Sequence, residues 1–170
     1  QVLILNGLQN ISENNNSKSV GLQLKYQPST SWGLTYNTLL GNESSFRQFH
    51  EALIQWNWND FYSTKLQFDL GAQNSNWCGF SSIHSFALAP TLTLVARLER
   101  YIDPQSQIVA SPSSSFVTSG ASIGLNLKPH DHLSYRTEVR SLRADQPVFN
   151  SQNGLSPSNT VIAASVGLSW

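Results

Sequence analysis

The sequence predicts an all-β protein whose antiparallel, up-and-down strands form a transmembrane β-barrel. Stretches of about ten residues in which apolar and polar side chains alternate recur along the chain, and this is the length and period of a tilted strand that crosses a bilayer. Charged residues are only 12% of the chain, about half the usual share of a soluble domain. No apolar run approaches the ~20 residues of a membrane helix. A barrel accounts for all three observations, because the hydropathies of lipid-facing and lumen-facing residues average out along each strand.

The alternation predicts about ten strands in this chain. In the clearest one, the apolar residues Val20, Leu22 and Leu24 share one face, and small or polar residues occupy the other. Facing is undecided in the first strand, and His84 falls among the outward apolar residues of the sixth. The strands are expected at 1–10, 20–27, 32–40, 49–58, 65–73, 80–89, 92–101, 121–128, 133–140 and 160–170.

The connections alternate in length. Short turns are predicted around Pro28, Asp60, Pro90 and Pro129. Mostly longer loops are predicted at 11–19, 41–48, 74–79, 102–115 and 143–158. Short periplasmic turns opposite longer extracellular loops are typical of outer-membrane barrels. Aromatic residues gather on the short-turn side, as an interfacial girdle would, namely Tyr26, Trp32, Trp56, Trp58, Phe86, Tyr135 and Trp170.

The last predicted strand, 160–170, ends its apolar face in Trp170. An aromatic final residue in this position resembles the C-terminal signal of bacterial outer-membrane barrels. We therefore predict that Trp170 is an assembly signal for the barrel insertion machinery. The chain has one cysteine, Cys78, so an intrachain disulfide is excluded. It has no Met and no signal peptide, and we interpret Gln1 as the start of a processed or truncated chain.

Four segments carry a resemblance to a known family. They are N-G-L-Q-N-I-S-E-N-N at 6–15, L-T-Y-N-T-L-L-G-N-E at 34–43, A-R-L-E-R-Y-I-D at 96–103 and Y-R-T-E-V-R at 135–140. These resemble segments of the OmpL-like putative β-barrel porin family, although Leu8 stands where Trp is expected. The resemblance implies a porin-like barrel in the outer membrane of a Gram-negative bacterium. Members are generally longer, so residues 1–170 are either a single barrel domain or the C-terminal portion of a larger barrel.

The predicted inner faces carry ionisable side chains, which we expect to line a pore. Opposed charges across a lumen would sort solutes by size and charge. The alternative is a ladder of ion pairs that fills the interior, which we expect if about ten strands close by themselves. The candidates are Lys25, Glu51, Lys65, Asp69, Arg97, Glu99, Lys128, Arg136, Glu138 and Arg140.

Other chemistries find little support. No G-x-S-x-G motif accompanies the serines and histidines, so we predict no catalytic residues and no enzyme activity. His130 and His132 flank Asp131 in a predicted turn, where solvated residues are a better interpretation than metal ligands. We expect no metal and no cofactor. A formal net charge of zero gives no indication of a nucleic-acid partner.

Three functions are compatible with this pattern. The first is a porin-like channel for passive diffusion of small solutes or ions. The second is a non-conducting structural barrel that anchors partners at the outer membrane through its loops. The third is a soluble, lipocalin-like ligand-binding barrel, which would require the apolar face to point inward. The expected partners are outer-membrane lipid, the insertion machinery, and other outer-membrane proteins or further copies of this chain.

Overall fold

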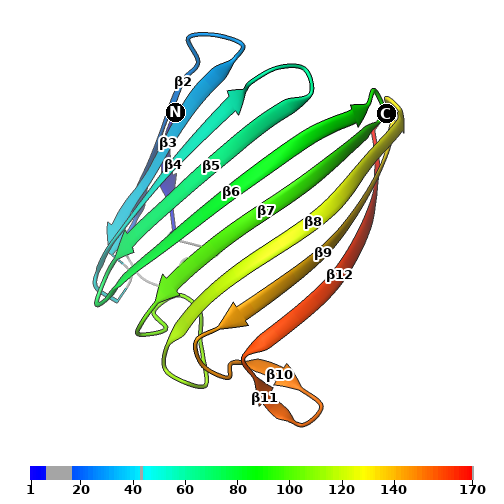
Figure 1. The fold of residues 1–170 in the computed structure, drawn as a ribbon. Coiled ribbons are helices and arrows are strands. Elements are labelled where there is room, and N and C mark those ends of the chain that lie inside the picture. Colours follow the sequence, from blue (N-terminus) through cyan, green and yellow to red (C-terminus); the bar gives the residue numbers. More distant parts are fainter. Residues whose placement is uncertain (7–16, 43, 170) are drawn as a thin grey trace.

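The computed structural model describes residues 1–6, 17–42 and 44–169, and these form antiparallel strands (Figure 1). Ten strands make one sheet in which each strand pairs with its neighbours along the chain, and a separate two-stranded hairpin is inserted before the last strand. The prediction of an all-β, up-and-down fold is confirmed. In sheet order, the ten strands are β1 (Val2–Leu5), β2 (Ser19–Tyr26), β3 (Trp32–Asn42), β4 (Phe46–Asn57), β5 (Tyr62–Ala72), β6 (Asn76–Ala89), β7 (Leu92–Asp103), β8 (Phe116–His130), β9 (Leu133–Ala144) and β12 (Ser158–Leu168). The hairpin consists of β10 (Phe149–Ser151) and β11 (Gly154–Ser156).

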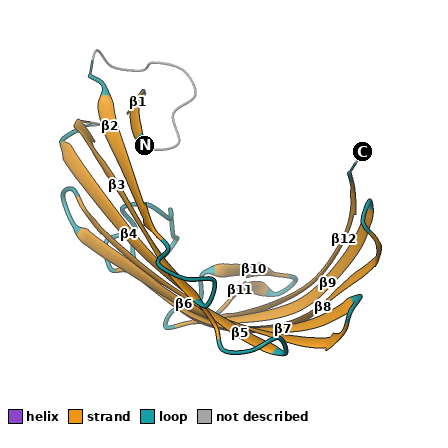
Figure 2. Ribbon diagram, turned by 90° about the horizontal axis from the view of Figure 1, so that it is seen from above, coloured by secondary structure: helices purple, strands orange, loops and turns teal. Residues whose placement is uncertain are grey.

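The sheet curves into an open trough (Figure 2). β1 and β12 form its two free edges, and no pairing joins them within the described residues. The hairpin β10–β11 lies beyond the ends of β9 and β12 (Figure 1), and the ring of Phe149 contacts that of Phe116 at a centroid distance of 6.3 Å. The sheet therefore has a convex face and a concave face, and loop residues pack on the concave one.

Apolar side chains occupy the convex face, as the alternation predicted. Leu24, Leu98 and Ile123 are each more than half exposed. Side chains crowd together on the concave face instead, where Trp77 retains only 4% of its accessible surface and Asp103 none. This arrangement is the opposite of a soluble ligand-binding barrel, which places its apolar side chains inside.

Several boundaries differ from the prediction. The first strand, expected at 1–10, is described only as Val2–Leu5, and the loop predicted at 11–19 falls largely outside the described residues. The loops predicted at 41–48 and 74–79 are wrong, because strand structure continues to Asn42 and restarts at Phe46 and Asn76. Polar side chains near strand ends remain hydrated there, so a polar composition does not end a strand.

Two of the connections that the structure describes throughout are long, and both lie at the same end of the sheet. Residues 104–115 join β7 to β8, and residues 145–157, which include the hairpin, join β9 to β12. At that end the β3–β4 and β5–β6 connections span only 43–45 and 73–75. The predicted contrast between short turns and long loops therefore applies to β7–β12 and not to β2–β6.

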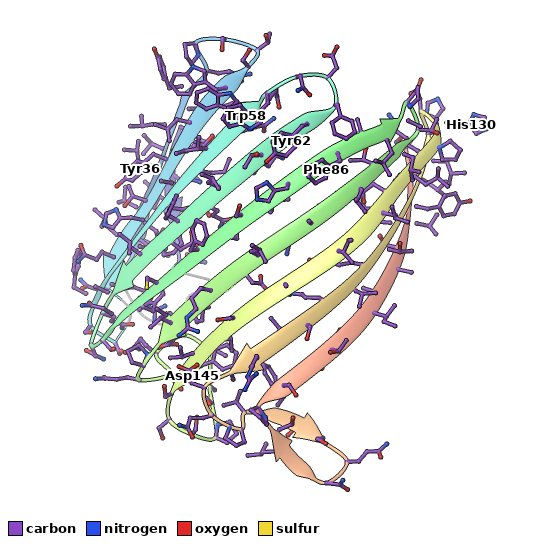
Figure 3. All side chains as sticks on the ribbon, viewed as in Figure 1. Tyr36, Trp58, Tyr62, Phe86, His130 and Asp145 are labelled. Atoms are coloured by element: carbon purple, nitrogen blue, oxygen red, sulfur yellow. The ribbon has the colours of Figure 1, made fainter. Side chains whose placement is uncertain are left out.

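Aromatic side chains gather at the other end of the sheet. In Figure 3, Trp58, Tyr62 and Phe86 lie near the short turns, whereas Asp145 lies at the end with the long connections. The rings follow one another from strand to strand with centroid distances of 5.0–6.4 Å between Trp56 and Trp58, Trp58 and Tyr62, and Tyr62 and Phe86. Tyr26 and Trp32 extend the series. This is the position expected of an interfacial girdle.

Candidate solute-facing surface

The concave face of β2–β5 carries a continuous ladder of amides and carboxylates. Gln23 Nε2 donates to Asn37 Oδ1 at 2.9 Å, and Asn37 Nδ2 donates to Glu51 Oε1 at 2.6 Å. Gln67 Nε2 then donates to Glu51 Oε2 at 3.1 Å and to Asp69 Oδ2 at 3.2 Å. Glu51 and Asp69 face each other in register, so the ladder ends in a pair of carboxylates held by one amide.

The concave face of β7–β9 carries a bidentate ion pair that spans two strands. Arg140 donates from Nε to Glu99 Oε1 and from Nη2 to Glu99 Oε2, both at 2.7 Å. Glu99 belongs to β7 and Arg140 to β9, so the glutamate side chain must pass over β8. Gly120 is the β8 residue in register with Glu99, and a Cβ there would collide with the carboxylate. The glycine provides the space in which the pair forms.

Arg97 and Arg136 lie beside this pair, and neither has an anionic partner in the part of the chain that the structure describes. Arg97 Nε is buried without a hydrogen-bond partner. Arg97 borders a hollow of about 450 Å³ shared with Glu99 and Arg140. It also borders one of about 210 Å³ shared with Arg136 and Glu138. Arg97 therefore lies between the two hollows with unused hydrogen-bonding capacity.

The remaining predicted residues occupy separate places. Lys25 borders a third hollow, with Gln55 among its other lining residues, whereas Lys65 lies on the same face in register with Gln55 and Ile83. Lys128 lies at the short-turn end, where it is exposed and its Nζ is 3.4 Å from Asp131 Oδ1. Trp170 lies outside the described residues.

The sequence did not reveal how the β7–β8 connection is held over the concave face. Asp103 is fully buried, and its carboxylate accepts hydrogen bonds from the backbone N–H groups of Gln107, Ile108 and Val109 at 2.7–3.0 Å. Val109 borders the same hollow as Arg97. An Asp followed by a Pro- and Ser-rich stretch is a known turn signal, and it is the feature that could have indicated this anchor.

The sequence also did not explain the histidines on the convex face. His84 Nδ1 lies 2.7 Å from Tyr62 Oη, and its Nε2 lies 2.7 Å from Ser82 Oγ. His50 Nδ1 lies 2.7 Å from Tyr36 Oη in a matching arrangement two strands away. Each imidazole therefore has polar partners on the sheet itself, which lowers the cost of an outward polar ring among apolar neighbours.

Both parts of the concave face carry charges of both signs. Glu51 and Asp69 share β4 and β5 with Arg47 and Lys65, whereas Arg97 and Arg136 share β7 and β9 with Glu99 and Glu138. A surface of this kind can attract and orient ionic solutes through electrostatics and hydrogen bonds. Within the described residues, no group of three or more His, Cys, Asp or Glu could hold a metal ion. No helix among them is long and apolar enough to cross a membrane.

Known proteins corroborate this architecture. A solved structure of the NanC porin superposes with a TM-score of 0.62 over 91% of this chain and 79% of that chain, at 8% sequence identity. At this identity the likeness shows the fold, an up-and-down arrangement of antiparallel strands. The search of curated proteins found no match. The family model described as "putative beta-barrel porin-2, OmpL-like" matches residues 1–170. The chain belongs to this porin family, which supports a barrel and a porin-like role.

Proposed function

We propose that this chain forms part of the wall of a passive diffusion channel for small hydrophilic solutes or ions in the outer membrane of a Gram-negative bacterium. The observation that carries the proposal is the division between the two faces of the sheet. The convex face is apolar and exposed at Leu98, Ile123 and Val139, whereas the concave face holds most of the charged groups of the strands. This is the division expected of a strand wall between lipid and water.

The free edges of the sheet must be paired in a bilayer. Unpaired backbone N–H and C=O groups in hydrocarbon each cost several kcal/mol, so an open sheet edge is not stable there. Closure is achieved either by pairing β1 with β12 or by further strands between these edges. We favour a larger barrel, because Arg97 and Arg136 lack anionic partners and require water near them. Roughly 16–18 strands leave an aqueous channel, whereas about eight are filled by side chains.

A non-conducting barrel remains the second candidate, and one observation favours it. Asp103 holds the β7–β8 connection over the concave face, and Phe149 of the hairpin contacts Phe116. If the barrel closed on ten strands alone, these segments would block a narrow lumen. The protein would then serve as an outer-membrane anchor.

Conductance in planar bilayers separates the two candidates. A channel should give stable conductance steps, and replacing both Arg97 and Arg136 with Gln should shift its selectivity towards cations, because two positive charges leave the wall. Lys18→Gln combined with Lys128→Gln is the matched control, since it removes the same charge away from the two hollows. Protein that inserts into bilayers but never conducts would support the structural barrel.

A further inference from the structure

The convex face of β7–β9 carries two arginines that the channel function does not use. The outward side chains of β7 run from Leu92 through Leu98 to Arg100, and those of β9 run from Tyr135 through Val139 to Arg143. Within the described strands of the large sheet, Arg100 and Arg143 are the only Lys, Arg, Asp or Glu residues at outward positions. A full charge on this face calls for a specific explanation.

The strand register brings these arginines together. Arg100 pairs with Ser119 on β8, and Ser119 pairs with Arg143 on β9, so the two arginines lie two strands apart in one row. Two strand spacings separate the α-carbons by about 10 Å, a distance that two arginine side chains can bridge towards one ligand. Together with Ala144 and Asp145, the three residues line a hollow of about 380 Å³.

The row of Arg100, Ser119 and Arg143, here called the basic row, has guanidinium N–H groups that make no hydrogen bond to any described residue. Arg100 Nη1 donates to Ser119 Oγ at 2.6 Å, and Arg100 Nη2 lies 3.6 Å from Asp145 Oδ2. The Arg100–Asp145 pair is solvent-exposed, with 43% and 58% of the two side chains accessible, so it is weak. Arg143 has no hydrogen bond or ion pair in the part of the chain that is described, apart from its strand backbone contacts. The row therefore carries a net positive charge and free guanidinium donors.

The position of the basic row along the strands indicates which kind of ligand it fits. Arg100 lies three residues before the end of β7 and Arg143 one residue before the end of β9, both at the end with the long connections. Asp145 marks that end in Figure 3. Below the row, towards the short turns, Leu98, Ile123 and Val139 expose an apolar wall. A basic row directly above an apolar wall matches an amphiphile that has an anionic head and acyl chains.

We propose that Arg100, Ser119 and Arg143 bind the phosphate of a membrane lipid whose acyl chains lie against Leu98 and Ile123. Guanidinium groups bind phosphate oxygens in a bidentate manner with charge-assisted hydrogen bonds, and the Ser119 hydroxyl supplies a further donor. Asp145 is the one carboxylate that lines the hollow, and it competes with the ligand for Arg100. The proposal rests on the convex face meeting lipid, which is part of the proposed function, but it does not require conduction.

The test is native mass spectrometry of the detergent-purified chain titrated with phosphatidic acid, and with diacylglycerol of the same acyl chains as the control lipid. We expect binding of phosphatidic acid alone. Arg100→Gln combined with Arg143→Gln should weaken it about tenfold or more, as the loss of charge-assisted hydrogen bonds predicts. Arg97→Gln combined with Arg136→Gln removes the same charge from the concave face and should leave binding unchanged. Asp145→Asn should strengthen binding.

Four results would overturn the proposal. These are equal binding of diacylglycerol, unchanged binding by the Arg100/Arg143 variant, an equal loss in the concave-face variant, and displacement of the lipid by millimolar inorganic phosphate. The last would identify a site for free phosphate instead. Insertion into bilayers is measured in parallel. A chain that inserts but fails these comparisons overturns the lipid site alone, whereas a chain that does not insert overturns the proposed function as well.

Discussion

The two halves of the sheet, β2–β6 and β7–β12, have the same strand geometry but different surfaces. On the convex face, β2–β6 carry the aromatic girdle and the two Tyr–His pairs, whereas β7–β12 carry mainly aliphatic residues and the outward arginines. On the concave face, β2–β5 carry a ladder of amides and acids, and β7–β9 carry arginines with free donors. The long connections 104–115 and 145–157 also belong to β7–β12.

This difference indicates that the two halves of the sheet have different roles. In β2–β6 the amides, the carboxylates and the two histidines described above have partners on an adjacent strand, so this half is suited to a rigid wall. In β7–β12 the uncompensated charges lie beside connections that cover the concave face, so this half is suited to contact with solutes and lipid. Four predictions test whether the division is real.

The largest effect should come from a charge in the apolar wall of either half. Phe68→Arg on β5 and Leu125→Arg on β8 each place a guanidinium on the convex face. Such a charge costs about 2–4 kcal/mol at the bilayer midplane, so both variants should fold poorly into lipid bilayers, as measured by the folded fraction on an unheated gel. Gln67→Arg on the concave face is the matched control. If Gln67→Arg fails while Phe68→Arg inserts, the assignment of the two faces is inverted.

The second effect concerns assembly at the C-terminal edge. Deleting Trp170 should lower insertion in cells, because we predict that the insertion machinery reads this residue, while refolding into detergent should change little. Tyr26→Ala removes a girdle ring at the N-terminal side and is the control. It should lower insertion in cells and refolding into detergent to the same extent, or change neither. An equal loss in cells and in detergent after deletion of Trp170 would indicate ordinary packing instead.

The third effect compares two glycines that make room for a neighbouring side chain. A Cβ at Gly71 would collide with the buried ring of Trp77, and one at Gly120 with the carboxylate of Glu99. Gly71→Ala should lower stability by about 1–3 kcal/mol, because a rigid ring in a crowded place cannot move aside. Gly120→Ala should cost less stability but should displace Glu99 from Arg140 and change channel selectivity, because the two charges are then no longer paired with each other.

Two measurements separate these outcomes, namely denaturant unfolding in detergent and reversal potentials in planar bilayers. Gly21→Ala is the control, because a Cβ there meets its neighbours only at ordinary contact distances of 3.5 Å and beyond. If Gly120→Ala behaves like Gly21→Ala in both assays, the Glu99–Arg140 pair does not depend on the space over β8.

Sequence periodicity predicted the fold and the facing of side chains, because successive side chains of a strand point to opposite faces of the sheet. It could not predict contacts that depend on register between strands. Glu99 and Arg140 are 41 positions apart and meet over Gly120, and nothing in their local sequence indicates this. Trp77 was predicted in a loop because Asn74 to Asn76 are polar, yet it is a buried strand residue. Arg100 lies within the strand predicted at 92–101, but its row with Ser119 and Arg143 depends on the register between strands.

The smallest effect tests the Tyr–His pairs on the convex face of β2–β6. Tyr62 Oη and Ser82 Oγ each lie 2.7 Å from a ring nitrogen of His84. A hydrogen bond of this kind contributes about 0.5–1.5 kcal/mol, so Tyr62→Phe should lower the unfolding free energy in detergent by that amount. His84→Phe loses the same hydrogen bond and leaves the buried Ser82 hydroxyl without this partner, so it should cost at least as much. In the double variant the effect of Tyr62→Phe should be smaller than in the parent, because only the hydrogen bond from Thr64 Oγ1 to Tyr62 Oη is then left to lose. Additive losses would mean that the pair is not coupled, and that the outward histidine is stabilised by lipid headgroups or water rather than by the sheet.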